Sequence, residues 1–193
     1  MKANWSSFFD ATRNAPPSKL LVKALEFTGD PGIAIDVGSG PLRDARYLLS
    51  LGFQVTALDA SPLVADEANK LDAGDRLNVV ISYFDAFPFP VAEYDLVNAM
   101  YALPFNPPRT FDAMFARLKD SLKTGGVFCG QFFGLHDSWN REDSNMSFHT
   151  TAQVEEMLKD LEVFYFEERE WDGKTTDGNA KHWHVYNVIA RKR

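Results

Sequence analysis

The chain has 193 residues, of which 45% are hydrophobic and 24% are charged. This size and composition favour one globular domain over residues 1–193, and they exclude a disordered chain. The formal net charge of −7, with no basic patch along the chain, argues against a nucleic-acid partner and favours a small-molecule substrate.

The chain has one cysteine, Cys129, so no internal disulfide is possible. The first 14 residues lack the apolar core of a secretory signal, and no apolar run approaches the length of a membrane span. We therefore expect a cytoplasmic protein with no membrane partner, and we expect it to be a monomer.

Helix-like and strand-like segments alternate along the first half of the chain. We expect Ser18 and Ser61 to be helix N-caps and Pro62 to be the first residue of a helix. Gly52 is expected to end the helix that precedes it. Apolar spacing predicts helices over 18–27, 42–51 and 62–71, and short apolar runs predict strands over 32–38, 53–59 and 76–84.

The second half continues the alternation and then changes. We expect strands over 94–100 and 126–133 around a helix over 109–122 that Gly125 and Gly126 stop. After a helix over 150–161, two strands over 162–171 and 181–192 are joined by a polar loop and must pair antiparallel. The pattern predicts a doubly wound α/β fold, with a mostly parallel seven-stranded sheet and one antiparallel C-terminal strand.

The turn after the first predicted strand, "AIDVGSGPLRDA", carries the main functional signal. Gly38 and Gly40 allow a sharp turn and a close approach to a ligand. Asp59 ends the next strand, where its carboxylate can accept hydrogen bonds from both hydroxyls of a ribose. A dinucleotide-binding turn would have its third glycine where Arg43 stands. Asp36, just before the glycines, suits a cationic ligand better than a pyrophosphate.

These residues resemble motif I of the class I S-adenosylmethionine-dependent methyltransferases, an acid followed by Gly-x-Gly. The resemblance extends from about Leu20 to the C-terminus, and it implies a Rossmann-like sheet of strand order 3-2-1-4-5-7-6. The Gly-Arg pattern at the turn, "FFGLHDSWN" and "FHTTAQVEEML" are similar to small-molecule members of the tellurite-resistance and thiopurine types.

The resemblance implies S-adenosyl-L-methionine as cofactor. Asp85, expected at the end of the third strand, would accept a hydrogen bond from the adenine amino group, with Phe84 or Phe87 against the ring. The expected cofactor-binding residues are Asp36, Gly38, Ser39, Gly40, Arg43, Asp59, Ala60, Asp85, Ala86 and Asn98.

The tripeptide Asn106-Pro107-Pro108 resembles a motif of amino-group methyltransferases, but its position differs. That motif directly follows the fourth strand, whereas here Asn106 comes eight residues after Asn98 and is followed after the prolines by Arg109. We expect the two prolines to introduce a helix.

Aromatic residues gather in the segments expected beyond the sheet's carboxyl end. The candidate substrate-binding residues are Tyr101, Phe105, Trp139, Trp5 and Phe9, with ordinary packing as the alternative for each. Residues 1–17, which also contain Phe8, form a possible lid. Arg13 either pairs with the cofactor carboxylate or lies on the surface.

His182 and His184 share one face of the last strand. We expect no metal site, because no acid or cysteine completes a ligand spacing with His136 or His149. The two histidines remain the candidates for a general base if the acceptor must lose a proton. No catalytic residue is assigned.

Methyl transfer from a sulfonium is an in-line displacement that needs alignment and exclusion of water more than acid catalysis. We expect this reaction, with a small-molecule nucleophile as acceptor. Two alternatives stay open: a module that binds S-adenosylmethionine or S-adenosylhomocysteine without turnover, and an NAD-linked oxidoreductase, which Arg43 and Asp36 disfavour.

Overall fold

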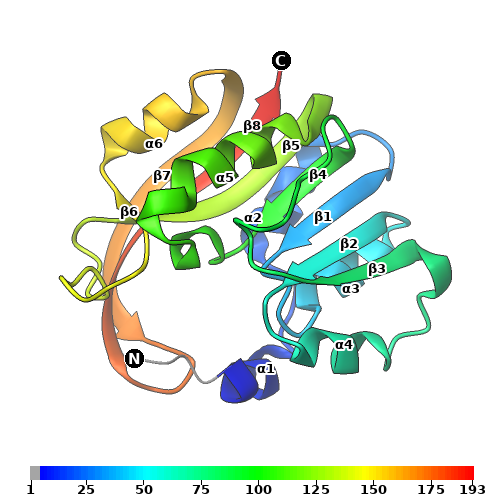
Figure 1. The fold of residues 1–193 in the computed structure, drawn as a ribbon, viewed down its shortest axis with the longest axis horizontal. Helices are drawn as coiled ribbons and strands as arrows, with labels where there is room; N and C mark the ends of the chain where they lie inside the picture. The colour runs from blue at the N-terminus through cyan, green and yellow to red at the C-terminus, as the bar shows by residue number, and fades with distance from the viewer. Residues whose placement is uncertain (1–4) are drawn as a thin grey trace.

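The computed structural model describes residues 5–193 as a central sheet with helices on both faces (Figure 1). The strand order is β3-β2-β1-β4-β5-β8-β7, and a short strand, β6, pairs with β5 outside this order. The strands are β1 (Ile33–Val37), β2 (Gln54–Asp59), β3 (Leu77–Ile81), β4 (Tyr94–Ala99), β5 (Leu122–Gly134), β6 (Phe148–His149), β7 (Leu161–Lys174) and β8 (Ala180–Lys192).

The expected doubly wound sheet with one reversed strand is confirmed. The reversed strand is β8, which runs antiparallel to both β5 and β7 and lies between them. The remaining main strands pair in parallel because helices connect them across the faces of the sheet. The two-residue strand β6 was not expected from the sequence.

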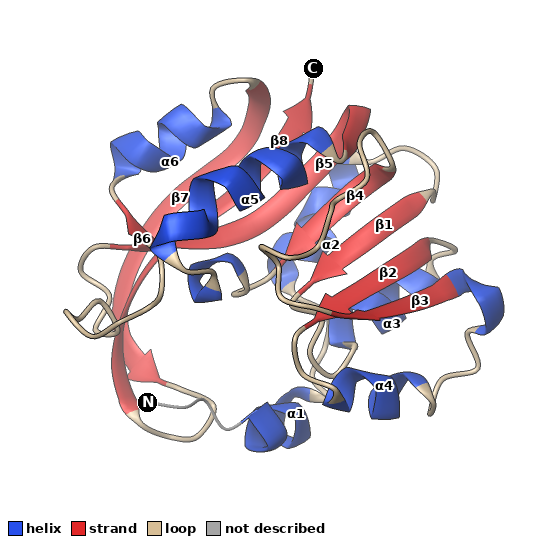
Figure 2. Cartoon of the chain, in the orientation of Figure 1, coloured by secondary structure: helices blue, strands red, loops and turns tan. Residues whose placement is uncertain are grey.

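Helices cover the two faces of the sheet, with α5 and α6 in front and α2 and α3 behind in Figure 2. Each layer encloses a buried apolar cluster, one containing Phe111 and Phe115 of α5 and the other Leu48 of α3. The helices are α1 (Trp5–Thr12), α2 (Lys19–Ala24), α3 (Arg43–Ser50), α4 (Leu63–Ala68), α5 (Pro108–Asp120) and α6 (Thr151–Leu158), with 3-10 turns η1 (Leu25–Phe27), η2 (Gly74–Arg76) and η3 (Leu103–Phe105).

Several expected boundaries were wrong, among them the end of β3, the end of α5 and the start of β5. β3 ends at Ile81, because it is an edge strand whose only partner, β2, ends opposite it at Asp59. Helix α5 ends at Asp120, before the glycines, and the chain enters β5 almost at once.

Ser18 is the N-cap residue of α2, as expected, but its hydroxyl donates to the Asp44 carboxylate and not to the helix backbone. The expected Ser61 cap was wrong, because Pro62 occupies the cap position of α4. Gly52 closes α3 with a φ of 98°, as expected, and its N–H donates to the carbonyl of Leu49.

Three strands that carry predicted site residues lie side by side. β1 pairs with both β2 and β4, and Asp36 stands directly between Ala57 and Asn98. Their carboxyl ends therefore meet at one edge of the sheet, which faces α1 in Figure 1. Among residues 5–193, no helix has the length and apolarity that crossing a membrane requires.

Candidate cofactor and acceptor site

The turn between β1 and α3 is built on three residues with positive φ. Gly38 and Gly40 have φ values of 71° and 50°, and Leu42 has 61°. A side chain at Gly38 would lie 2.5 Å from the Cβ of Ala102, so the loop after β4 packs directly against the turn. Leu42 adopts the left-handed conformation although it is not glycine, and its buried side chain holds it there.

A line of buried polar side chains crosses the sheet beneath this turn. The Asn98 side-chain amide donates to Asp36 Oδ1 at 2.7 Å, and its oxygen accepts from the Cys129 thiol at 3.3 Å. Asn98 is fully buried beside Asp36 on the neighbouring strand, and it does not line the cavity at the turn. The structure therefore gives Asn98 the position of a residue that orients Asp36, which differs from the expected direct contact.

Asp36 is a buried acid that forms no ion pair among the described residues. Burial, and then the negative charge of Asp44, raise the pKa of Asp36 to about 7. Its Oδ2 has no hydrogen-bond partner, and neither has the buried hydroxyl of Ser39 two residues after β1 ends. Arg43 does not neutralise Asp36, because its guanidinium pairs with Asp44 at 3.1 Å. Two orphaned polar atoms therefore lie together beside the turn.

Asp59 supports the turn as well as facing the expected ribose position. Its Oδ2 accepts from the N–H of Gly40 and its Oδ1 from the N–H of Ser61, each at 2.8 Å. Partial burial raises the pKa of Asp59 in spite of these donors. Ala60, the next residue, is exposed. Each carboxylate oxygen retains acceptor capacity for a second donor.

Asp85 lies four residues beyond β3, in a turn, and not at the strand end that the sequence predicted. The hydroxyl of Thr110 in α5 donates to Asp85 Oδ2 at 3.1 Å, and Asn106 donates in turn to Thr110 at 3.1 Å. Ala86 beside it is exposed. Pro107 and Pro108 begin α5, as expected, and Asn106 orients the Thr110 side chain rather than facing a substrate.

Helix α1 closes over the glycine turn. Phe8 and Thr12 line a cavity of about 40 Å³ together with Asp36, Ser39 and Gly40. This volume holds about one water molecule. The adjoining residue Arg13, a candidate for the cofactor carboxylate, instead pairs with Glu67 of α4 at 2.7 Å.

Aromatic side chains from four segments form a continuous chain of ring contacts, which we call the aromatic collar. Its centroid separations are 5.4 Å for Trp5–Phe105, 6.1 Å for Phe105–Trp139, 5.7 Å for Trp139–Trp183 and 5.8 Å for Trp183–Tyr101. Four of the five expected acceptor residues thus lie together. Phe9 is buried and has no ring contact with the collar among residues 5–193, whereas Trp183, which the sequence did not single out, is a member.

A buried ion pair underlies the collar. Lys181 pairs with Asp137, and both side chains are fully buried. The Lys181 ammonium lies 4.0 Å from the ring centre of Trp139 and 4.3 Å from that of Trp183. These two indole faces therefore already hold a cation.

The histidines of β8 meet acids that the sequence spacing did not reveal. His184 Nε2 lies 2.9 Å from Glu168, and His182 lies within 3.2 Å of both Glu170 and Asp172. Sequence spacing showed no acid that completes a ligand set with these histidines, whereas the antiparallel register brings acids from β7 beside them. His149 is elsewhere, packed 4.5 Å from the ring of Phe111.

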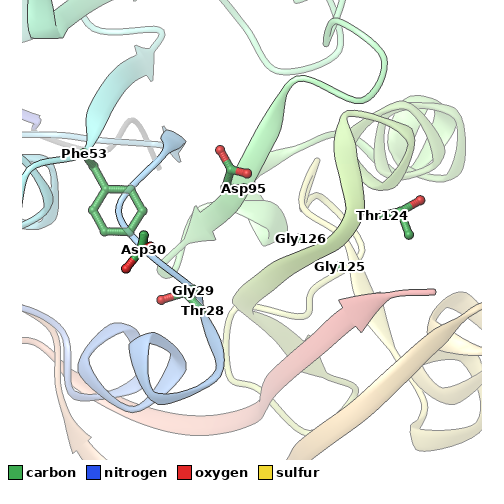
Figure 3. Close-up of a pocket in the computed structure, with 8 residues that line it drawn as sticks. All are labelled: Thr28, Gly29, Asp30, Phe53, Asp95, Thr124, Gly125 and Gly126. Carbon is green, nitrogen blue, oxygen red and sulfur yellow. The ribbon is translucent and has the colours of Figure 1, made fainter.

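A second and larger cavity, of about 260 Å³, lies at the opposite, amino end of the strands (Figure 3). Asp95 lines it, but its carboxylate is already engaged by Lys123 and by the N–H of Ile33, each at 2.8 Å. These partners hold the pKa of Asp95 below its usual value despite partial burial. The cavity is distant from the glycine turn, and nothing in it suggests chemistry.

Comparison with known protein families finds one matching domain model. Residues 34–126, close to half of the chain, match the model of the methyltransferase domain. No curated protein sequence matches the chain significantly.

Solved structures share the whole architecture at low sequence identity. TehB from Haemophilus influenzae superposes with a TM-score of 0.79 at 18% identity, over 96% of this chain and 66% of TehB, so the chain spans just under two thirds of TehB. A 1,6-didemethyltoxoflavin-N1-methyltransferase from Burkholderia thailandensis, with 1,6-didemethyltoxoflavin and S-adenosylhomocysteine bound, superposes with a TM-score of 0.63 at 19% identity. The match covers 100% of this chain and 92% of that enzyme. A SAM-dependent methyltransferase from Methanosarcina mazei superposes with a TM-score of 0.68 at 16% identity, over 87% of this chain and 95% of that enzyme.

The family match falls on the segment that contains the glycine turn, Asp36, Asp59, Asp85 and Asn98, and the sheet around it has the strand order expected for this family. Residues 34–126 therefore match the methyltransferase-domain family, and the chain as a whole has the fold of solved S-adenosylmethionine-dependent methyltransferases.

Proposed function

We propose that this protein is an enzyme that transfers the methyl group of S-adenosylmethionine to a small-molecule nucleophile. The observation that carries the proposal is the pair of orphaned buried polar atoms, Asp36 Oδ2 and Ser39 Oγ, beside a glycine turn. A buried acid near its midpoint of ionisation, without a cation, suits a ligand that brings a positively charged amino group.

The three acids have distinct proposed roles along the carboxyl edge of the sheet. Asp36 and Ser39 would bind the cofactor's amino-acid end, with Asn98 orienting Asp36 from the neighbouring strand. Asp59 would accept the ribose hydroxyls while continuing to hold the N–H of Gly40. Asp85, oriented by Thr110, would accept from the adenine amino group.

The acceptor is proposed to bind at the aromatic collar. The collar presents ring faces from Trp5, Phe105, Trp139, Trp183 and Tyr101, which suits a flat or apolar molecule. Because Lys181 already occupies two of these faces, the collar favours a neutral or anionic acceptor over a cationic one.

Helix α1 is proposed as the lid of the site, within residues 1–17. Phe8 and Thr12 of α1 narrow the cavity beside the glycine turn to about 40 Å³, so an outward movement of α1 would make room for the cofactor. Its return would place Trp5 and Phe8 over the bound molecules and exclude water. The ion pair of Arg13, the residue after α1, with Glu67 of α4 would hold the closed position.

The cofactor supplies an electrophilic methyl group on a sulfonium, whose leaving group is a neutral thioether. The residues of this chain therefore need to align the nucleophile and exclude water, and they need not protonate a leaving group. His182 and His184 are both paired with acids of β7, so neither is assigned as a base.

The comparisons support the proposal at the level of fold and family. The Burkholderia thailandensis enzyme binds the small molecule 1,6-didemethyltoxoflavin together with S-adenosylhomocysteine, and TehB shares the fold over 96% of this chain.

Calorimetry with S-adenosylmethionine, S-adenosylhomocysteine and NAD tests cofactor use. We expect micromolar binding of both sulfur ligands and none of NAD. Absence of binding by both sulfur ligands would refute the proposal.

Release of S-adenosylhomocysteine in the presence of thiols, phenols, small amines or metalloid oxyanions then tests transfer. Turnover with one of these classes supports an enzyme. Tight cofactor binding without turnover in any class favours the non-catalytic module.

A further inference from the structure

A cluster of histidines and acids lies where three segments meet beyond the end of β5. His136 comes two residues after β5, Glu170 belongs to β7, and His184 belongs to β8. Glu170 and His184 are direct partners in the β7–β8 register. The His184 ring lies over Gly134, where any side chain would collide with it at 2.2 Å. The fold thus leaves space for this ring at the meeting point.

The spacing of the nitrogen and oxygen atoms matches a metal coordination sphere. His136 Nδ1 lies 3.0 Å from Glu170 Oε1, and His184 Nδ1 lies 3.8 Å from the same oxygen. One ligand atom from each of the three residues lies within 4.8 Å of the other two. Ligands at about 2.05 Å from a tetrahedral zinc ion are separated by roughly 3.3 Å. The two observed nitrogen–oxygen distances, 3.0 Å and 3.8 Å, lie on either side of that value.

The hydrogen bonds of His184 show which of its nitrogens carries the lone pair. The backbone N–H of His136 donates to His184 Nδ1 at 3.2 Å, so Nδ1 is deprotonated. Nε2 therefore carries the proton and donates it to Glu168 at 2.9 Å. A histidine whose second nitrogen donates to a carboxylate is the arrangement that orients metal-binding histidines.

The electrostatics of the cluster also favour a cation. Glu168, Glu170 and Asp172 project from one strand toward three imidazoles. The His182 ring bridges Glu170 at 3.2 Å and Asp172 at 2.8 Å, so His182 competes with a metal for Glu170. His136 is 69% exposed, which gives an ion in solution access to the cluster.

We propose that His136, Glu170 and His184 bind one divalent transition-metal ion of the zinc class, with Glu168 orienting His184. Two imidazoles and one carboxylate suit zinc, cobalt or nickel and not magnesium. The ion would replace the His136 N–H as the partner of His184 Nδ1. It would join the segment after β5 to both strands of the β7–β8 hairpin and leave one coordination position open.

The test uses the full chain without a histidine tag, stripped of metal with a chelator and titrated with Co²⁺. We expect one Co²⁺ per chain, with the visible absorption of a four-coordinate ion, and displacement by Zn²⁺. His136→Ala and Glu170→Gln should each weaken binding at least tenfold. Both residues are exposed, and far-UV circular dichroism checks that the variants fold.

His182→Gln is the matched control, because His182 contacts Glu170 without belonging to the proposed ligands. Its affinity for Co²⁺ should equal or exceed that of the wild type, since a competitor for Glu170 is removed. The proposal is overturned if the wild type binds no Co²⁺, if binding survives in both ligand variants, or if His182→Gln abolishes it.

Discussion

Replacement of Asp36 by Asn should stabilise the fold and impair cofactor binding at the same time. Asn has nearly the same shape, and its side-chain oxygen can still accept from Asn98 as Asp36 Oδ1 does at 2.7 Å. Its amide would replace the unpartnered Oδ2 with a neutral donor near Asp44. The substitution therefore removes a buried charge without opening a cavity.

The magnitude follows from the pKa of Asp36, which burial and Asp44 raise from 3.8 to about 7. Because the folded-state pKa is the higher one, the wild type loses free energy of unfolding as the pH rises from about 4 to 7. At roughly 1.4 kcal/mol per pH unit, the loss approaches about 4 kcal/mol. Asn cannot ionise, so the variant should match the wild type near pH 4 and exceed it above pH 7.

Urea unfolding, followed by circular dichroism between pH 4.5 and 8.5, measures the difference. Asp95→Asn is a control of opposite sign, because Lys123 lowers the pKa of Asp95. Asp95 contributes stability that is present above its unfolded pKa and lost on acidification, so Asp95→Asn should be the less stable protein at pH 7. A difference between Asp36→Asn and wild type that does not grow with pH would refute this reasoning.

Binding of S-adenosylhomocysteine is the second readout of Asp36→Asn. The neutral side chain cannot balance the ligand's ammonium group, so the affinity at pH 7.5 should fall at least tenfold. Wild-type affinity should itself decrease as the pH falls below 7 and Asp36 becomes protonated. Unchanged affinity in the variant would leave Asp36 as a purely structural acid.

Three further substitutions test the ribose, collar and lid assignments. Asp59→Ala should weaken cofactor binding by roughly 1.5–3 kcal/mol in calorimetry, and an unchanged affinity in a folded variant would remove Asp59 from the site. Asp59→Asn is the control, because it removes the charge but keeps an oxygen that can accept from the N–H of Gly40. Trp183→Leu should raise the KM for the acceptor about tenfold with little change in the KM for the cofactor, and equal effects on both would argue against the collar as the acceptor site. Arg13→Ala releases α1 from Glu67, so stopped-flow association of the cofactor should become faster and amide exchange in α1 should increase; no change in either contradicts a lid.

The sheet was predictable because its signal is local. Parallel strands that are covered on both faces appear in the sequence as short apolar runs. Such runs predicted the positions of β1, β2 and β4. The glycine turn was equally visible, but the conformation of Leu42 was not. Its φ of 61° depends on packing that no single-residue preference reports.

The histidine cluster could not be found from sequence spacing. Glu170 and His184 are neighbours because β7 and β8 pair in a particular register, and that register shifts by one residue between Val163 and Tyr165. A one-residue change in register moves every side chain of a strand to the other face. Asp85 is similar, because its position depends on Thr110 of α5 rather than on the strand before it.

The aromatic collar gives the protein a built-in optical probe. The chain has four tryptophans, and each is in the collar or stacked on it: Trp5, Trp139 and Trp183 are members, and Trp171 lies 5.8 Å from Trp183 with nearly parallel rings. Excitation at 295 nm therefore reports almost entirely on the proposed acceptor site. An acceptor that enters the collar, or a movement of α1 that withdraws Trp5, should change the intrinsic fluorescence of an unlabelled protein. Candidate acceptors can thus be ranked by binding before any turnover assay exists.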